Sequence, residues 1–436
     1  MKRQILPILA VLVAAVGSIS SSSAQVANTA DITRIIETLA ADDMRGRAAL
    51  TPDIAKAADF IASEFRAAGL KPYAEDNFRQ TFEVKKVATI NQQVSLEGIA
   101  LDDAHFIMFN VKNKLQWNAD STIQSLHIAK DEDFSMRFRD IILNNPDQAI
   151  VWVDPAFESQ LARFKRIYSR EDIIPAGQPA NNKPVKVFII AKEQPKNFQI
   201  AADSKSEVFP LFNVAAVIPG KSKPEEYVVF SSHYDHIGIL PAVEGDSIAN
   251  GADDNASGTT AMISLAKHYK QLDQNERTLI FVAFTAEEIG MFGSKYFSTN
   301  IDADKVVAMI NIEMIGKDSK FGPNSLYVTG YNNSNLAPLM QENLKGTAFK
   351  FYPDPYPQQN LFYRSDNAVL AALGVPAHTF STSQIDKDSY YHTVHDDLET
   401  LDIENIKSSI EAIAQGTIGL ITGKQTPDRV EKLKDE

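Results

Sequence analysis

From about residue 210 onward, short apolar runs alternate with loops and amphipathic helices. Apolar runs that predict buried strands lie at residues 227–230, 278–284, 305–312 and 377–380. Helices are predicted at residues 259–269 and 402–421. Strands that alternate with helices indicate a mixed, mainly parallel central sheet with helices on both faces. The chain is therefore predicted to have an α/β fold.

The first half of the chain has a different pattern. Amphipathic helices are predicted at residues 30–41 and 53–68, and both would pack on the main domain. Between residues 86 and 205, short strand-like runs such as 149–153 and 185–190 alternate with polar connections. We interpret this stretch as an inserted smaller segment of β-rich or mixed structure, although part of it is also compatible with the main sheet.

These patterns divide the chain into five parts. The predicted parts are a signal peptide (1–24), the first part of the main domain (25–85), the insertion (86–205), the rest of the main domain (206–424) and a charged tail expected to fray (425–436).

The first residues are typical of a secretory signal peptide. Lys2 and Arg3 precede an apolar run at 5–16, and small residues at 22–24 offer a cleavage site. The alternative is a membrane anchor, but the run is too short to span a bilayer and no second span follows. We expect a secreted or periplasmic protein with no membrane span.

Composition narrows the chemistry. The chain has 436 residues and a formal net charge of -13, which argues against nucleic acid or an anionic membrane as the partner. It has no cysteine, so disulfides, thiolate metal ligands and a cysteine nucleophile are excluded. Any metal ion would be held by His, Asp and Glu.

Two clusters of such residues lie after the first predicted strand of this half. In the run 233–236, which reads His-Tyr-Asp-His, His233 can bind a metal through a ring nitrogen, and Asp235 can orient that ring. Asp253 and Asp254 are adjacent carboxylates in a loop that opens into a helix. A divalent cation would relieve their repulsion.

Three further clusters follow the later strands. Glu287 and Glu288 end one strand, and neighbouring side chains of an extended segment point to opposite sides. Glu313 ends the next strand, and Tyr391 and His392 lie farther downstream. Each cluster alone is more typical of a solvated surface. Together they lie at the carboxyl ends of strands, where α/β sheets bind ligands, and they predict a metal site.

The ordered motifs resemble the di-zinc exopeptidase family that includes bacterial leucyl aminopeptidases and glutamate carboxypeptidase II. The likeness is loose over residues 30–85 and strong over 210–400. It implies two Zn²⁺ ions per chain. The implied ligands are His233, Asp254 as the bridge, Glu288, Glu313 and His392. His233 would share one zinc with Glu313, and Glu288 would share the other with His392.

The resemblance also implies catalytic roles and two departures from the family. Glu287 would be the general base, and the Tyr391 hydroxyl would lie near the developing oxyanion. The family usually has Asp at the position of Glu313. It often has His at the position of Asn367, which is not a usual ligand, so we expect altered substrate contacts there.

The implied function is hydrolysis of peptide bonds near one end of a peptide substrate. We favour an aminopeptidase because of the bacterial family members. A carboxypeptidase would need an arginine clamp such as Arg364, for which a structural salt bridge is the competing role. A glutaminyl cyclase-type acyltransferase would use one zinc, and a binding protein would have lost ligands. Related proteins often carry a protease-associated domain as an insertion, and by analogy residues 86–205 would form such a domain or a lid.

Overall fold

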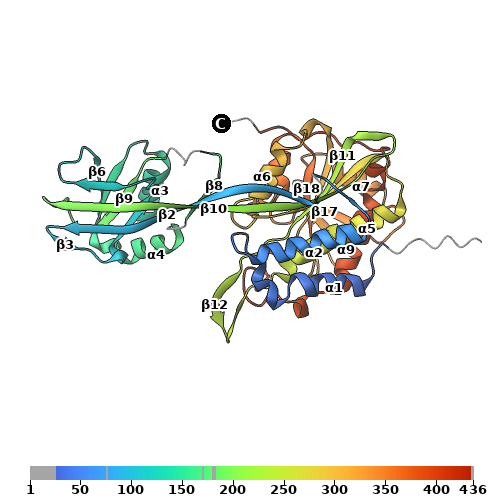
Figure 1. Ribbon diagram of the computed structural model, residues 1–436, viewed down its shortest axis with the longest axis horizontal. Helices are drawn as coiled ribbons and strands as arrows, with labels where there is room; N and C mark the ends of the chain where they lie inside the picture. The colour runs from blue at the N-terminus through green and yellow to red at the C-terminus, as the bar shows by residue number, and fades with distance from the viewer. Residues whose placement is uncertain (1–25, 75–76, 169–170, 179–182, 434–436) are drawn as a thin grey trace, which may run out of the picture.

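The computed structural model describes residues 26–433 except 75–76, 169–170 and 179–182 (Figure 1). The predicted signal peptide, residues 1–24, lies outside the described residues. The chain forms a large lobe and a small lobe, which are joined by a long two-stranded ribbon (Figure 1). None of the helices within the described ranges has the length and apolar character needed to cross a bilayer.

The large lobe is built on a mixed sheet with the strand order β17-β16-β18-β15-β11-β14-β10-β2-β3. β11 is parallel to β14 and β15, and β15 is parallel to β18. β10 is antiparallel to β14, and β16 is antiparallel to β18. The strands of this lobe are β1 (Lys71–Pro72), β11 (Lys223–His233), β14 (Arg277–Phe284), β15 (Val306–Ile312), β16 (Ser325–Val328), β17 (Lys350–Pro353) and β18 (Ala377–Ser381).

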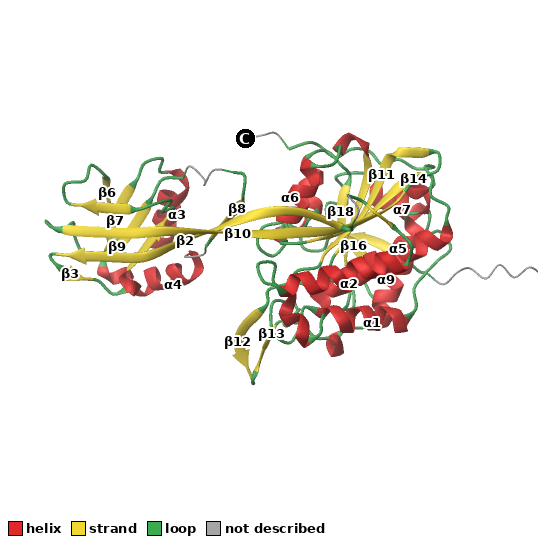
Figure 2. Ribbon diagram, viewed as in Figure 1, coloured by secondary structure: helices red, strands yellow, loops and turns green. Residues whose placement is uncertain are grey.

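Helices cover both faces of this sheet (Figure 2). One face packs against α1 (Thr29–Leu39), α2 (Asp53–Ala67), α5 (Gly258–Leu272), α7 (Leu336–Glu342) and α9 (Ile403–Gly416). The other face packs against α6 (Phe292–Thr299) and α8 (Asn367–Ala372). The short helix α10 (Ile418–Ile421) follows α9. The side chains of β11 alternate between the two faces. Val228 and Phe230 pack in the core with α1, α2, α5, α7 and α9, and Val229 packs in the core with α6 and α8. The predicted α/β fold is confirmed.

The small lobe contains most of the stretch predicted as an insertion. Its sheet has the order β4-β9-β7-β6 and carries two helices. The elements are β4 (Phe106–Phe109), β5 (Leu115–Asn118), β6 (Gln124–Ile128), α3 (Phe134–Asn144), β7 (Ala149–Val153), α4 (Glu158–Tyr168) and β9 (Lys186–Ile190). Phe134 and Phe138 of α3 and Phe188 of β9 are buried together in the core of this lobe. This lobe thus has its own core and mixed α/β structure.

The ribbon consists of β2 (Arg79–Leu96) and β10 (Phe198–Ile218), which stay paired from Val214 opposite Arg79 to Phe198 opposite Leu96. β3 (Ile99–Ala100) and β8 (Asp172–Pro175) pair with β2, and β5 pairs with β10. β10 also enters the main sheet. Both alternatives for the insertion therefore hold in part, because one strand belongs to the ribbon and to the central sheet.

The direction of the strands turns the carboxyl edge of the main sheet toward the small lobe. β10 runs from the small lobe into the large one, and β14 runs back, with Ala283 opposite Val214. β11, β15 and β18 run parallel to β14. The hairpin of β12 (Ile239–Val243) and β13 (Asp246–Ile248) projects on the same side (Figure 1). Residues that follow these strands therefore face the small lobe.

The C-terminal segment packs against the large lobe as far as Leu433. Val430 is buried, and the guanidinium of Arg429 donates a hydrogen bond to the carbonyl oxygen of Val306 at 2.7 Å. The backbone N–H of Leu433 donates to Ala372 at 3.0 Å. The expectation that the charged tail frays is wrong for these residues, because apolar side chains within it are buried in the second core.

Candidate metal centre

The predicted site residues come from five segments that end at the sheet edge facing the small lobe. His233 is the last residue of β11, and Glu287 and Glu288 lie in the turn after β14. Glu313 follows β15, and His392 lies in the long loop after β18. Asp254 lies in the turn before α5. The carboxyl ends of parallel strands thus bring together residues that lie up to 159 positions apart, as His233 and His392 do.

Asp254 lies between the two histidines. Its Oδ1 atom is 3.3 Å from Nε2 of His233, and its Oδ2 atom is 3.2 Å from Nε2 of His392. The carboxylate of Asp396 fixes this turn by accepting hydrogen bonds from the backbone N–H groups of Asp253 and Asp254, at 3.0 and 2.9 Å. Asp254 therefore offers one oxygen to each histidine, as a carboxylate that bridges two cations would.

The two other glutamates extend the two halves of the site. Glu288 places its Oε2 atom 3.1 Å from Nε2 of His392. Glu313 is buried beside His233, and it accepts a hydrogen bond from the Ser365 hydroxyl. Glu313 thus lies on the His233 side of Asp254 and Glu288 on the His392 side.

The donor set fits zinc. The Nε2 atoms of His233 and His392 are buried and accept or donate no hydrogen bond within the described part of the chain. Two ligands of a tetrahedral zinc, each about 2.0–2.1 Å from the ion, lie about 3.3 Å apart. The N···O distances of 3.1–3.3 Å around Asp254 match that spacing. Buried carboxylates at such spacing need cations, since burial penalises their charge.

Asp235 has a different role from the predicted one. The Nδ1 atom of His233 lies 3.1 Å from the backbone carbonyl oxygen of Asp235 but 3.9 Å from its carboxylate. The carbonyl therefore orients the ring. The carboxylate of Asp235 instead accepts hydrogen bonds from the backbone N–H groups of Glu287 and Glu288, at 3.1 and 3.4 Å. It thereby holds the turn that carries both glutamates.

That turn is also fastened to the ribbon. Asn213 of β10 is fully buried, and its side-chain amide donates to the backbone oxygen of Gly293 and to Gln80 of β2, both at 2.9 Å. Its Oδ1 atom accepts from the backbone N–H of Thr285 at 3.3 Å. Glu287 and Glu288 lie on a turn and not on an extended strand, and Glu288 faces His392.

Two residues of the site were not predicted. Arg47 is fully buried and donates to the backbone oxygens of Tyr234 and Gly251, at 2.9 and 3.0 Å, so one guanidinium holds two metal-site loops. Nothing in its local sequence indicates this. His236 is buried, with Nδ1 2.9 Å from Oε1 of Glu288. Its place in the His-Tyr-Asp-His motif is the sequence signal that points to it.

The environments of Glu287 and Tyr391 differ. Burial raises the pKa of Glu287 well above its usual value, and the charges of Glu313, Asp366 and Glu288 add to this against the opposing charge of His233. The ring of Tyr391 stacks on His392, with 3.9 Å between centroids. Burial, and then the nearby carboxylates, raise the pKa of Tyr391. Its hydroxyl therefore stays protonated and can donate a hydrogen bond.

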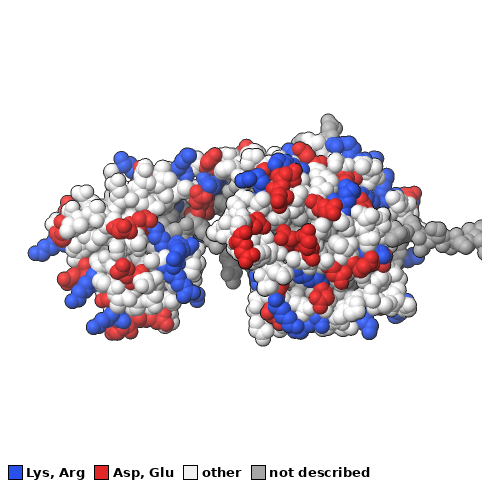
Figure 3. All heavy atoms as spheres, turned by 90° about the horizontal axis from the view of Figure 1, so that it is seen from below, with Lys and Arg blue, Asp and Glu red and all other residues white. Residues whose placement is uncertain are grey.

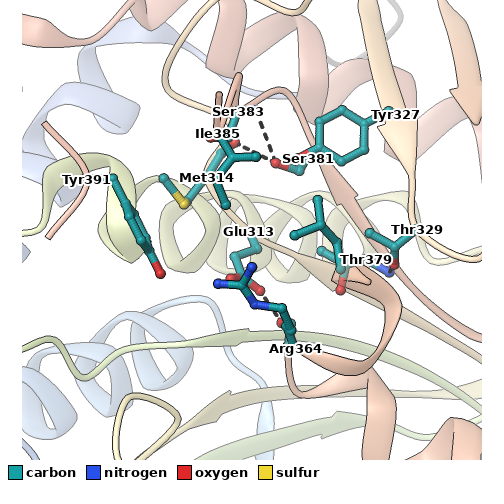
Figure 4. A pocket seen from close by; sticks show the side chains of 12 residues that line it. Glu313, Met314, Tyr327, Thr329, Arg364, Thr379, Ser381, Ser383, Ile385 and Tyr391 are labelled. Atoms are coloured by element: carbon teal, nitrogen blue, oxygen red, sulfur yellow. Dashed lines mark hydrogen bonds between the residues drawn. The ribbon is translucent and has the colours of Figure 1, made fainter. Parts of the chain in front are cut away.

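A small pocket opens beside Glu313 (Figure 4). It has a volume of about 60 Å³. Its walls combine apolar side chains with hydroxyls, and they comprise Glu313, Met314, Tyr327, Thr329, Leu361, Arg364, Ser365, Thr379, Ser381, Ser383, Ile385 and Tyr391. Glu313 and Tyr391 belong both to the metal site and to this pocket. A molecule bound at the candidate metal site would therefore have room for an adjacent side chain in this pocket.

Arg364 and Asn367 behave differently from each other. Within the described ranges the guanidinium of Arg364 forms no ion pair, and it donates a hydrogen bond to Gln359 at 3.3 Å. The structural salt bridge weighed for it is therefore absent from the described part of the chain. Asn367 is fully buried and donates to the backbone oxygens of Phe362 and Ala377 at 3.0 and 3.2 Å. It serves the fold around α8.

Removing metal is expected to reverse the pH dependence of stability at this site. Burial raises the pKa of Glu313 and of Asp235 to about 7, from 4.5 and 3.8. A carboxyl with a raised pKa stabilises the fold below its unfolded pKa, and this contribution is lost as pH rises through the folded value. The metal-free protein should therefore lose stability between about pH 4 and pH 7, whereas zinc, which needs ionised ligands, should bind more tightly as the pH rises.

Thermal melts of chelator-treated and zinc-loaded protein at pH 5 and pH 7 would check this. The gap between the two melting temperatures should widen with pH, and Glu313→Gln should flatten the pH dependence of the metal-free form. A metal-free protein that gains stability from pH 5 to pH 7 would contradict the prediction.

The chain is similar to known peptidases. The model of peptidase family M28 matches residues 213–417. A probable leucine aminopeptidase of Trichophyton verrucosum is 29% identical over 207 residues, which are 45% of this chain and 53% of that protein. A probable zinc metalloprotease of Pyrenophora teres f. teres is 34% identical over 122 residues, 26% of this chain and 25% of that protein. The chain thus spans about half or less of these two relatives.

A solved structure shares the fold over nearly the whole chain. The aminopeptidase from Aneurinibacillus sp. strain AM-1 superposes with a TM-score of 0.56 at 17% identity, and the match covers 94% of this chain and 96% of that one. Every residue of the predicted metal site lies inside the range matched by the family model. The chain therefore belongs, through residues 213–417, to peptidase family M28.

Proposed function

We propose that the protein is an exported two-zinc aminopeptidase. The observation that carries the proposal is the position of Asp254, whose two oxygens face His233 and His392 at 3.3 and 3.2 Å. His233, Asp254 and Glu313 would hold one ion, and His392, Asp254 and Glu288 the other. The relatives named as aminopeptidases and as a zinc metalloprotease support this. Export rests on the signal-like N-terminus.

In this mechanism the protein's own groups move protons and hold charge. A zinc pair supplies Lewis acidity for water and for the scissile carbonyl. The carboxylate of Glu287 takes a proton from the attacking water as the water oxygen bonds to the carbonyl carbon. Glu287 then delivers that proton to the leaving nitrogen as the C–N bond breaks.

Tyr391 would stabilise the oxyanion. Its hydroxyl remains protonated, because burial and the neighbouring carboxylates raise its pKa. It lines the pocket together with Glu313 (Figure 4). A hydrogen bond to the carbonyl oxygen as negative charge develops is the kind of interaction that accelerates acyl transfer. The pocket beside it would receive the substrate's first side chain.

The charge of the surface favours a positively charged peptide end. Acidic side chains gather on the face of the large lobe in Figure 3, whereas Lys and Arg gather on the edge of the small lobe facing it. An acidic surface attracts a free terminal ammonium group. The small lobe faces the sheet edge that carries the candidate metal site. This position supports a lid-like role in which the small lobe limits the size of substrates.

A peptide panel with zinc-loaded protein tests the proposal. Peptides with a free N-terminus should be cleaved one residue at a time, while N-acetylated copies should resist, and chelation should abolish turnover until zinc is restored. The zinc content should be two ions per chain. Cleavage of blocked peptides from the C-terminus would identify a carboxypeptidase instead. If the small lobe limits access, kcat/KM should fall as the peptides lengthen.

A further inference from the structure

His236 is a buried histidine whose ring faces the His392 half of the metal site. It lies three residues beyond His233 in the loop after β11, and 1% of its surface is exposed. Its ring centroid is 5.7 Å from that of His392, at an angle of 70° between the rings. The five-ligand pattern implied by the family resemblance leaves it without a role, although it is as buried as the predicted ligand His233.

The contact that matters joins His236 to Glu288. Nδ1 of His236 is 2.9 Å from Oε1 of Glu288, a normal hydrogen-bond distance. An ionised carboxylate can only accept, so Nδ1 carries the proton and donates it. The other oxygen of Glu288, Oε2, is then the one that faces Nε2 of His392, at 3.1 Å. The two histidines thus divide the two carboxylate oxygens between them.

The ring of His236 is held in place from two sides. A Cβ atom built on Gly251 would lie 2.6 Å from two ring carbons, so the absence of a side chain at 251 makes room for the ring. The backbone N–H of His236 donates to the carbonyl oxygen of Arg47 at 3.3 Å. Arg47 in turn donates to the carbonyl oxygen of Gly251 at 3.0 Å. The packing thus fixes the ring relative to the turn that leads to Asp254.

Direct ligation is the competing role for His236, since ligand atoms of His236, Asp254 and Glu288 all lie within 4.8 Å of one another. Nδ1 of His236 is 3.7 Å from Oδ2 of Asp254 but 2.9 Å from Oε1 of Glu288. The shorter distance is that of a hydrogen bond, which favours positioning over ligation.

We propose that His236 is a positioning residue: its Nδ1–H holds one oxygen of Glu288 so that the other points at the cation on the His392 side. The inference rests on the proposed two-zinc function. Hydrogen-bond partners of metal ligands typically contribute 10- to 100-fold to metal affinity. Loss of His236 should therefore weaken the zinc position of Glu288 and His392 and spare that of His233 and Glu313.

Three substitutions separate positioning from packing and from direct ligation. His236→Asn keeps an N–H donor at the place of Nδ1, His236→Gln moves the donor to the place of Nε2, and His236→Ala removes it. His395→Ala is the matched control, because His395 is exposed and lies in the same loop as His392. Zinc alone is the probe: each purified full-length variant is titrated in a competing chelator, and bound zinc is counted by mass spectrometry.

We expect the Ala and Gln variants to bind one zinc ion about 10- to 100-fold more weakly than wild type and the second normally. The Asn variant and the His395 control should bind both ions within a few-fold of wild type. The metal-free Ala variant should melt below wild type, because replacing a buried ring leaves a cavity, so the selective weakening of one ion is the readout of positioning.

The opposing outcomes are distinct. Two zinc ions bound with unchanged affinity in His236→Ala would overturn the positioning role alone. Equal weakening in the Asn, Gln and Ala variants would also overturn it, because it would indicate direct ligation or packing. A lower melting temperature of the metal-free Ala variant, with both ions weakened, would indicate packing. A wild-type protein that binds fewer than two zinc ions would refute the proposed function and this inference with it.

Discussion

Replacing Glu287 by glutamine is expected to lower kcat by about 10²- to 10⁴-fold while two zinc ions stay bound. Glutamine keeps the shape of the side chain but cannot accept the proton of the attacking water. The family resemblance makes Glu287 the base and not a zinc ligand, so its loss should not release metal. Steady-state kinetics on a free-N-terminus peptide, with zinc counted in the same sample, would measure both.

The control for this variant is Glu342→Gln, which changes an exposed glutamate at the end of α7. It should leave kcat and zinc content unchanged. A Glu287→Gln protein with near-normal kcat would remove Glu287 as the base, and a zinc-depleted one would show that it is a ligand.

Replacing Asp254 by asparagine is expected to cost the site its second zinc ion and most of its activity. The amide has one oxygen and no charge, so it cannot face both His233 and His392 as the carboxylate does at 3.3 and 3.2 Å. The loss of zinc affinity should exceed the roughly 100-fold that partners of ligands contribute. Zinc per chain, measured after dialysis, should fall from two to one or fewer.

Asp253→Asn is the matched control, since it alters the neighbouring carboxylate. Asp253 accepts a hydrogen bond from the backbone N–H of Gly316 at 2.7 Å, and its other oxygen is 3.7 Å from Nζ of Lys317. Its role is therefore to join two loops, and its substitution should lower the melting temperature but keep two zinc ions. Equal zinc loss in Asp253→Asn and Asp254→Asn would contradict the bridging role of Asp254. It would show that both substitutions act by disturbing the turn.

The sequence predicted the parts of this fold that depend on local pattern. The apolar runs at 278–284 and 305–312 correspond to β14 and β15, and the helical period at 53–68 corresponds to α2. Several site residues follow strands whose carboxyl ends meet at one edge, which predicted a metal site, but the individual ligands were implied by the family resemblance. The ribbon was not predicted. Its residues pair over long separations and are half exposed, so they carry neither a clear apolar period nor a turn signal.

The unpredicted parts of the site depend on backbone contacts. Arg47 reaches carbonyl oxygens near residues 234 and 251, and no side-chain pattern indicates which carbonyls a fold brings to a guanidinium. The acceptor for His233 Nδ1 was predicted as the carboxylate of Asp235 but is the carbonyl of that residue. Sequence spacing correctly placed Asp235 beside the ring of His233. Whether the carbonyl or the carboxylate of Asp235 contacts that ring depends on the backbone torsions.

The geometry of the ribbon has a consequence for how such chains diversify. The polypeptide leaves the large lobe on β2 and returns on β10, with Lys86 directly opposite Glu207. A two-residue turn can join two paired residues of antiparallel strands. The segment between Lys86 and Glu207 can therefore be regarded as an insertion at the tip of a hairpin. Gain, loss or exchange of the distal lobe during evolution therefore leaves the register of the central sheet, and the order of the metal-site segments, untouched.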